Sequence, residues 1–599
     1  MRKLSVRRTL AAAAFLLVAA VITARVLLAP RGDTNAPGQS PQVAATAEPI
    51  MPQLPELPPL SLPVPTPTPD PLAACKLDPA NLPPLATGHV FHTCGSRILS
   101  ETGEPAQITG VSWFGMETGT FAPHGLWSRN WKTMLDQIAS LGFNTIRLPF
   151  TNEALVDGQM PKSINYDINP DLKGKTSLEV MDVLIKGAGE RGLKVILDRH
   201  RPTSEGQSEL WYTDRVSEER WVQDWVMLAT HYRGNSTVMG VDLHNEPRGP
   251  ATWGTGDQST DWRLAAERAG NAVLQANPYL LIFVQGVEQV NGDFYWWGGN
   301  LQGVRDNPVR LQVPGRVVYS PHDYGPDVYS QGWFNTPDFP SNLPGVFDTH
   351  WGYIADQQIA PVVLGEFGGS AGEGQDGVWQ RTLIDYMKQH SIGWINWSFN
   401  PDSSDTGGLL AEDWLTVEQS KAQLIQPYLA PPLDVGKSGV FGRPQSQIDV
   451  QVQAPGDQGS QLSLQLHILN DGPDAVTPKS LQVRYWFKPG TLGKATQQAD
   501  VDYADVGTKS VIAAVAAPRS DGLSAVTLTF ADGATPIQPY TTSTITLRVH
   551  KSDWSAYAKT SDATLALYRD GKLVVGSEPA PVPQASPGSV TVTPSVPSR

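Results

Sequence analysis

Two glutamates each follow a short run of apolar residues in this chain. Glu246 stands in Val-Asp-Leu-His-Asn-Glu-Pro (241–247), and Glu366 stands in Pro-Val-Val-Leu-Gly-Glu-Phe-Gly (361–368). Such runs are typical of buried strands, and in a parallel α/β barrel the carboxyl ends of the strands carry the chemistry. Two carboxylates that face each other across one groove suffice to cleave a glycosidic bond. The sequence therefore predicts a catalytic pair at these two positions.

Polar and aromatic side chains also end other predicted strands. One such residue alone is more often structural, but it is improbable that all of them end strands at one rim by accident. These residues are Arg147, Asp198, Arg199, His200, Asn245, His322, Asp323, Tyr324 and Trp397. For Asp198 we expect a structural role, in which it pairs near Arg199 or with a loop amide.

Short apolar runs alternate with longer amphipathic ones between about residues 76 and 430. The predicted strands cover 110–115, 143–150, 194–200, 238–246, 280–287, 317–324, 361–367 and 392–399. The predicted helices between them include 131–141, 177–191, 218–232, 262–277 and 377–390. Eight such repeats predict a (β/α)₈ TIM barrel. An open doubly wound sheet is the alternative, disfavoured because no Gly-rich dinucleotide fingerprint follows the first strand.

The chain changes character after the barrel. Alternating runs at 447–453, 462–469, 481–487, 510–514, 525–530, 543–549 and 564–568 are separated by turn residues. This spacing is typical of an antiparallel β-sandwich. We therefore expect an α/β barrel followed by an all-β sandwich. The predicted boundaries are 74–430 for the catalytic barrel, 431–440 for a short linker, 441–580 for the sandwich and 581–599 for a loose tail.

The amino-terminal residues are typical of an export signal. Arg2, Lys3, Arg7 and Arg8 precede an apolar run over 10–23, so residues 1–29 form a signal peptide or, alternatively, an uncleaved membrane anchor. A Pro-rich spacer follows at 30–73. In an exported protein the only two cysteines, Cys75 and Cys94, can form one disulfide, and two unpaired thiols are the alternative.

Composition limits the partners. The net charge of −14 argues against nucleic acid, whereas a neutral polysaccharide needs no basic surface. The 18 Trp residues offer flat faces for sugar rings, although most Trp residues pack in cores. No cluster has metal-ligand spacing, so we expect no metal and no cofactor. We expect a monomer.

Several stretches carry a family resemblance. Asn-Glu-Pro (245–247) and Gly-Glu-Phe-Gly (365–368) resemble glycoside hydrolase family five, and specifically its secreted bacterial endo-β-1,4-glucanases. The resemblance covers about 88–430, including 124–129, 142–149, 195–202, 296–302 and 400–408.

The resemblance implies a role for each rim residue. Glu246 would be the acid/base and Glu366 the nucleophile. Arg147 and Tyr324 would hold the nucleophile ionised, His200 and His322 would line the cleaved subsite, and Asn245 would bind the 2-hydroxyl. Trp397 would lie beneath the −1 sugar, and His124, Trp127 and Trp297 would contact substrate elsewhere in the cleft.

The sandwich carries a second resemblance. Residues 549–557 and 567–579 are similar to a family-three cellulose-binding module, and 484–487 and 501–507 agree with it. The segment between Asp562 and Leu567 is shorter than the family pattern and lacks the Trp expected there. We expect Trp554 in the core, so that the module grips single glucan chains or braces the barrel.

These features predict a secreted, retaining endo-β-1,4-glucanase that acts on cellulose. Two alternatives stay open. The same mechanism could act on mannan, xyloglucan or mixed-linkage glucan. Alternatively, the protein could be a non-catalytic, cell-surface carbohydrate-binding protein. The intact glutamate pair, with its supporting Arg and Tyr, speaks against the last.

Overall fold

The computed structural model describes residues 90–372, 374–433, 448–453, 459–472, 474–557 and 563–580. The predicted signal or anchor, the Pro-rich spacer, Cys75 and the tail lie outside these residues, as does most of the predicted linker. Cys94 is disulfide-bonded. Within the described part of the chain, no helix is both long enough and apolar enough to cross a bilayer.

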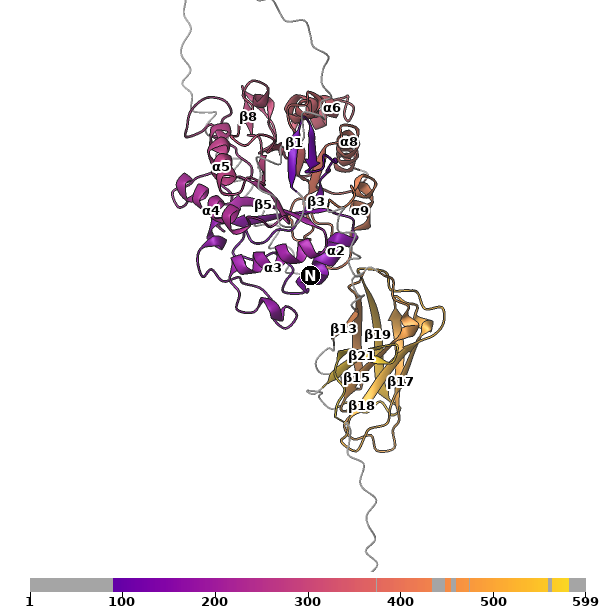
Figure 1. The fold of residues 1–599 in the computed structure, drawn as a ribbon. Helices are drawn as coiled ribbons and strands as arrows, with labels where there is room; N and C mark the ends of the chain where they lie inside the picture. Colours follow the sequence, from indigo (N-terminus) through magenta and orange to yellow (C-terminus); the bar gives the residue numbers. More distant parts are fainter. Residues whose placement is uncertain are drawn as a thin grey trace, which may run out of the picture. The chain divides into compact units, whose positions relative to one another are not determined.

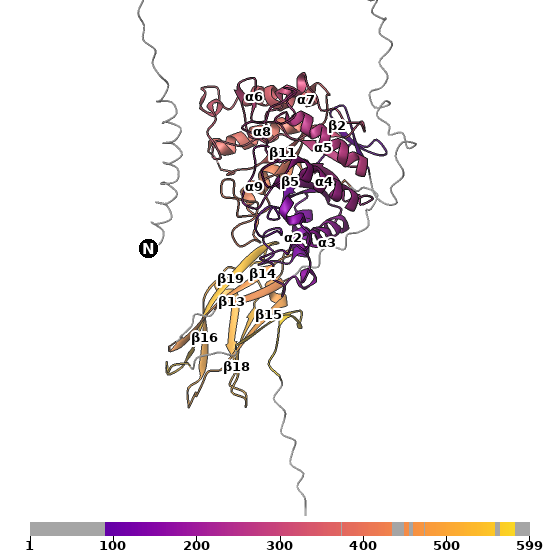
Figure 2. The same cartoon turned by 90° about the vertical axis from the view of Figure 1, so that its left-hand side faces the viewer.

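Eight parallel strands form the barrel (Figures 1 and 2). They are β3 (Thr109–Ser112), β4 (Thr145–Thr151), β5 (Lys194–Arg201), β6 (Val238–Asp242), β7 (Leu281–Val284), β10 (Val317–Tyr319), β11 (Val363–Phe367) and β12 (Gly393–Asn396). Their order is β10-β7-β6-β5-β4-β3-β12-β11, and parallel bridges from Tyr319 to Val362 and from His322 to Glu366 join β10 to β11. The predicted barrel is confirmed.

The helices lie outside the strands, as Figures 1 and 2 show. They are α2 (Trp131–Ser140), α3 (Ser177–Glu190), α4 (Glu218–His231), α5 (Trp262–Ala276), α6 (Leu343–Phe347), α7 (Tyr353–Asp356), α8 (Gln375–Gln389) and α9 (Gln419–Ile425). Thr176 and Glu179 form a capping box at the start of α3, and the Ser217 side chain caps α4. Because the helices cover the strands, nearly every strand residue is buried, which explains the continuous apolar runs.

Shorter elements complete the barrel domain. Two hairpins are formed by β1 (Phe91–Cys94) with β2 (Arg97–Ser100), and by β8 (Gln289–Val290) with β9 (Asp293–Phe294). A π-helical turn covers Asp348–Gly352, and 3-10 turns cover Asn152–Leu155, Pro170–Leu172, Gln302–Arg305, Gly332–Asn335 and Gln426–Tyr428.

The carboxyl-terminal part contains two antiparallel sheets, as predicted. One has the order β13-β14-β19-β16 and the other β17-β18-β15-β20-β21. The strands are β13 (Ile448–Gln453), β14 (Gln461–Asn470), β15 (Leu481–Phe487), β16 (Gln497–Ala504), β17 (Val511–Val515), β18 (Ser524–Phe530), β19 (Thr541–Lys551), β20 (Thr564–Arg569) and β21 (Lys572–Gly576), with 3-10 turns at Pro478–Ser480 and Thr508–Ser510. Their alternate residues form one apolar core.

Two of these strands were not predicted. β16 alternates polar residues with small or half-buried ones, so its apolar pattern is weak. β21 follows β20 through the two-residue turn Asp570-Gly571, where both residues have positive φ (51° and 76°). An Asp-Gly pair between two strands is a strong hairpin signal, which the sequence did offer.

Candidate active site

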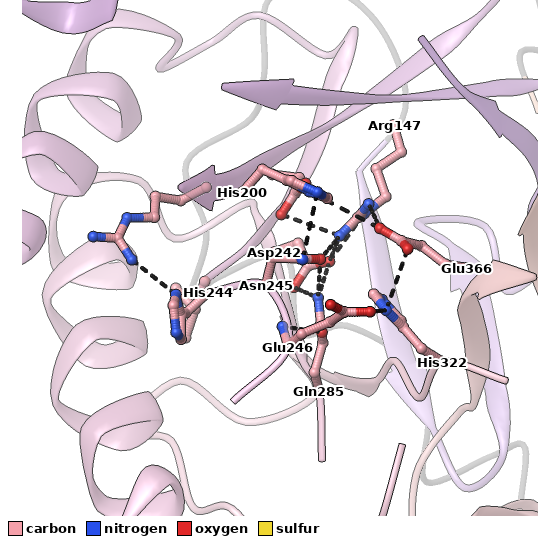
Figure 3. A network of polar contacts seen from close by, with 12 residues as sticks. Arg147, His200, Asp242, His244, Asn245, Glu246, Gln285, His322 and Glu366 are labelled. Carbon is pink, nitrogen blue, oxygen red and sulfur yellow. Dashed lines mark hydrogen bonds and ion pairs between the residues drawn. The ribbon is translucent and has the colours of Figure 1, made fainter. Parts of the chain in front are cut away.

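The two glutamates predicted as a catalytic pair come together at the carboxyl ends of the strands (Figure 3). Glu366 lies within β11, and Glu246 lies four residues beyond the end of β6. An oxygen of each lies within 4.8 Å of the other and of one His322 ring nitrogen. His322 Nδ1 is 3.2 Å from Glu246 Oε1 and 3.4 Å from Glu366 Oε2. One small group of atoms can therefore contact both carboxylates.

Glu366 is held by two strong donors. Arg147 Nη1 donates to its Oε1 at 2.6 Å, and the Tyr324 hydroxyl donates to its Oε2 at 2.6 Å. Burial and the charge of Glu366 raise the pKa of Tyr324 well above its ordinary value, so this hydroxyl keeps its proton. Charge-assisted hydrogen bonds of this kind stabilise the ionised carboxylate. Both oxygens of Glu366 are thus occupied by hydrogen-bond donors.

Arg147 is the centre of the polar network. Its Nη2 donates to Asn245 Oδ1 at 2.9 Å and lies 3.1 Å from Asp198 Oδ1, while Nε and Nη2 both donate to Asp242 Oδ2 at 3.1 and 3.0 Å. Burial alone would lower the pKa of this guanidinium, but the charges of Asp198, Glu366 and Asp242 raise it above its ordinary value. Asp242 was not predicted as a site residue. The only sequence feature that pointed to it is its charge inside an apolar strand run.

Glu246 has a different environment. Burial raises the pKa of its carboxyl to about 7, although the charges of Arg248 and Arg147 oppose that rise. Its backbone has a φ of 53°, and its N–H donates to Gln285 Oε1 at 2.8 Å. A buried carboxyl of this kind retains a proton near neutral pH, as a general acid requires.

The two site histidines are neutral. Burial lowers the pKa of His200 to about 3 and that of His322 to about 4. His200 Nδ1 is 2.6 Å from Asp198 Oδ2, and the amide nitrogen of Asn245 approaches its Nε2 at 3.5 Å. His200 therefore donates from Nδ1 to Asp198. The expected partner of Asp198 was wrong, because this carboxylate pairs with His200 and Arg147 rather than with Arg199 or a loop amide.

Trp397 lies in a stacked aromatic layer beside these groups. Its ring stacks on Phe114 with the centroids 5.2 Å apart and on His200 at 5.2 Å, with interplanar angles of 9° and 8°. Ser403 accepts from its Nε1 at 3.1 Å. The indole is thus fixed in orientation by its neighbours.

The other predicted sugar contacts differ in exposure. Trp127 is 37% exposed and packs edge-on against Trp414, and His124 beside it is 2.8 Å from Asp402 Oδ2. Trp297 is 46% exposed; the Arg248 guanidinium lies 4.2 Å from its ring centroid, and its Nε1 donates to a glutamate at 3.1 Å. Three other tryptophans are buried in the core: Trp113, Trp211 and Trp296.

Glu246, His322 and Glu366 are also the one set of buried groups, within the described residues, whose geometry could hold a metal ion. Both oxygens of Glu366 already accept hydrogen bonds, one of them from a guanidinium. A cation here would have to share that carboxylate with Arg147 at short range. The donor set fits a hydrogen-bonded carboxylate better than a metal ligand.

A closed eight-stranded barrel with one carboxylate after its fourth strand and another in its seventh has the arrangement of a glycoside hydrolase. Residues 99–403 match the cellulase family, glycosyl hydrolase family 5, and residues 447–576 match a cellulose binding domain. The chain belongs to glycosyl hydrolase family 5 and is a glycoside hydrolase of the cellulase type.

Known relatives agree over the barrel. An endoglucanase of Paenibacillus polymyxa is 53% identical over 355 residues, which cover 58% of this chain and 89% of that protein. The major extracellular endoglucanase of Xanthomonas campestris pv. campestris is 44% identical, over 57% of this chain and 72% of that protein. The solved endocellulase of Pyrococcus horikoshii aligns with a TM-score of 0.55 at 43% identity, covering 57% of this chain and 99% of that one.

The outer face of the β13-β14-β19-β16 sheet carries a row of polar and aromatic side chains. Arg548 makes a bidentate ion pair with Asp502, and His550 pairs with Asp500. Trp554 is 51% exposed and stacks on His550 with the centroids 4.2 Å apart and 5° between the planes. The expectation that Trp554 is core was wrong: it follows β19 in a turn with a φ of 57°, which leaves the indole outside the sandwich.

Proposed function

We propose that this protein hydrolyses internal β-1,4-glucosidic bonds of cellulose with retention of the anomeric configuration. The observation that carries the proposal is the pair of glutamate oxygens within 4.8 Å of each other. Glu366 accepts from Arg147 and Tyr324, whereas burial raises the pKa of Glu246 to about 7. Retaining enzymes place their carboxyl groups about 5–5.5 Å apart, whereas inverting enzymes need room for a water molecule. Endo cleavage is supported by the endoglucanase relatives.

The contacts support a two-step mechanism. Glu366 attacks the anomeric carbon while Glu246 donates its proton to the leaving glycosidic oxygen, so the C1–O bond breaks as an ester to Glu366 forms. The ester removes one negative charge from the site, which lowers the proton affinity of Glu246. Glu246 then takes a proton from water, water attacks the anomeric carbon, and Glu366 leaves as a carboxylate.

The neighbours have supporting roles in this proposal. His322 bridges the two carboxylates, Asn245 is held by Arg147 where it can bind the 2-hydroxyl, and Trp397 supplies the platform for the −1 sugar. Trp127 and Trp297 offer exposed rings for sugars farther along the chain.

We also propose that residues 441–580 form a module that lies on cellulose. The exposed Trp554 indole and the flat, bidentate Arg548–Asp502 pair lie on one sheet face. Their flat surfaces match the flat faces of the sugar rings of a glucan. The exported protein would then act outside the cell, since a polymer of this size cannot enter it.

Hydrolysis of cellopentaose, followed by proton NMR, tests the mechanism. We expect the β anomer to appear first and to mutarotate later, and early α anomer would contradict retention. Glu366→Ala should abolish hydrolysis while circular dichroism shows an intact fold; unchanged activity would refute the assignment. Parallel rates on mannan, xyloglucan and mixed-linkage glucan decide whether cellulose is the preferred glycan.

A further inference from the structure

Gln285 occupies the end of the fifth barrel strand, to which the proposed mechanism assigns no residue. It directly follows β7 and is completely buried. Its Nε2 donates to both oxygens of Asp242, at 3.1 and 2.9 Å, and its Oε1 accepts from the Glu246 backbone N–H at 2.8 Å (Figure 3). The amide thus connects two elements of the site through opposite ends.

At one end the amide fixes the backbone of the proposed acid. Glu246 has a φ of 53°, a left-handed conformation that a non-glycine residue keeps only where its surroundings hold it. Gly298 closes over the contact: a Cβ there would lie 2.6 Å from Gln285 Oε1 and 3.1 Å from Glu246 Cα. The acid's backbone is therefore enclosed, and the glutamine oxygen is the acceptor for its N–H.

At the other end the amide supports the anchor of the proposed nucleophile. Asp242 Oδ2 also accepts from Arg147 Nε and Nη2, and Arg147 Nη1 donates to Glu366. The contacts form an unbroken path from Glu246 N–H through Gln285, Asp242 and Arg147 to Glu366. Each contact along this path is between 2.6 and 3.1 Å.

We infer that Gln285 is a positioning residue that sets the separation of the two glutamates by bonding the backbone of one and the anchor of the other. The inference rests on the proposed function. Asp242 can only accept and a backbone N–H can only donate, so the group between them needs a donor on one side and an acceptor on the other. An amide satisfies both, and an apolar side chain satisfies neither.

Kinetics of the full chain with Gln285→Leu test this role on cellopentaose. We expect kcat to fall about 10–100-fold, because small misplacements of catalytic groups carry costs of that order. KM should change less than about threefold, since the amide does not contact substrate. A kcat within about twofold of wild type would overturn the inference.

Gln137→Leu is the matched control. Gln137 is equally buried, on α2, and its Nε2 donates to the Leu415 carbonyl at 2.8 Å. Both substitutions remove a satisfied buried amide, so both should lower the unfolding temperature. Only the variant at position 285 should lower kcat, and equal losses of kcat in both variants would mean that the role is structural.

The pH dependence of Gln285→Glu adds a second measurement, because a purely structural role would not change that dependence. When protonated, the introduced carboxyl can donate to Asp242 and accept from Glu246 as the amide does; when ionised, it faces Asp242 as a like charge. The other titratable or charged groups around it are Arg147, Asp198, Glu246 and His322. At acid pH this variant should be more active than Gln285→Leu, and its activity should decline at lower pH than that of wild type.

The outcomes separate this inference from the proposed function. Early α anomer, or no loss in Glu366→Ala, would remove the proposed function itself. The inference alone would be refuted if the enzyme retains configuration and Glu366→Ala is inactive, but the pH profile of Gln285→Glu follows wild type at every pH.

Discussion

Replacing Tyr324 by Phe removes one hydroxyl that donates to Glu366 at 2.6 Å in a buried site. A hydrogen bond to a charged group contributes about 1.5–3 kcal/mol. Since about 1.4 kcal/mol corresponds to tenfold in rate, kcat/KM should fall by about 10- to 150-fold.

The measurement is kcat/KM on cellotetraose across the acid range, with Tyr319→Phe as the control. Tyr319 is equally buried in β10, and its hydroxyl accepts from the Val309 N–H at 2.9 Å, away from the carboxylates. The control should stay within about twofold of wild type. If Tyr324→Phe behaves like the control, the hydroxyl does not stabilise the charged form and the division of roles between the glutamates is refuted.

Three further outcomes follow from the same geometry. Wild-type activity should fall as pH rises through about 7, where Glu246 loses the proton that burial retains, and Glu246→Gln should lower kcat by about 10²–10⁴-fold and remove that limb of the profile. Arg147→Met should lower the free energy of unfolding in urea by about 3–5 kcal/mol, because it leaves buried carboxylates unpaired, whereas Lys186→Met at an exposed pair should change it by less than about 0.5 kcal/mol. Trp554→Ala should weaken retention on insoluble cellulose about tenfold without changing kcat on soluble oligosaccharides, while Trp486→Ala on the other sheet should leave both unchanged.

The sequence was sufficient to predict all eight barrel strands and the approach of Glu246 to Glu366. Two residues predicted at the same rim do not join that cluster: Arg199 contacts Asn152 and His244, and Asp323 accepts from Tyr295 and Trp379. Parallel strands share one carboxyl edge, so knowing where the runs end is nearly enough to know which side chains meet. The predicted strands were too long at that edge. β6 ends at Asp242 rather than at Glu246. Of the residues beyond it, Asn245 and Glu246 join the site, whereas His244 contacts Arg199.

The contacts that could not be predicted from the sequence join residues that are far apart in the chain. Gln285 lies in the predicted strand 280–287, but nothing local identifies its partners, which are 39 and 43 positions away in the chain. The ion-pair partner of Asp198 was equally hard to predict, because that partner, Arg147, lies on the neighbouring strand. Trp554 was assigned to the core from the average burial of tryptophan, and only the turn after β19 decides otherwise.

The environment that makes Glu246 an acid also destabilises its ionised form, and this cost should be measurable. Its pKa in the folded protein is raised to about 7, against about 4.3 in an unfolded chain. A raised carboxyl pKa contributes stability that is fully present below the unfolded value and is lost as pH rises through the folded value.

Glu246→Gln lacks this ionisation, so its unfolding free energy relative to wild type should increase between about pH 4 and pH 7, by up to about 4 kcal/mol. Urea unfolding of both proteins across that range measures the difference, with Glu190→Gln at an exposed position as the control. Parallel stability curves for Glu246→Gln and wild type would mean that burial does not hold the proton on Glu246, and that some other group supplies it to the leaving oxygen.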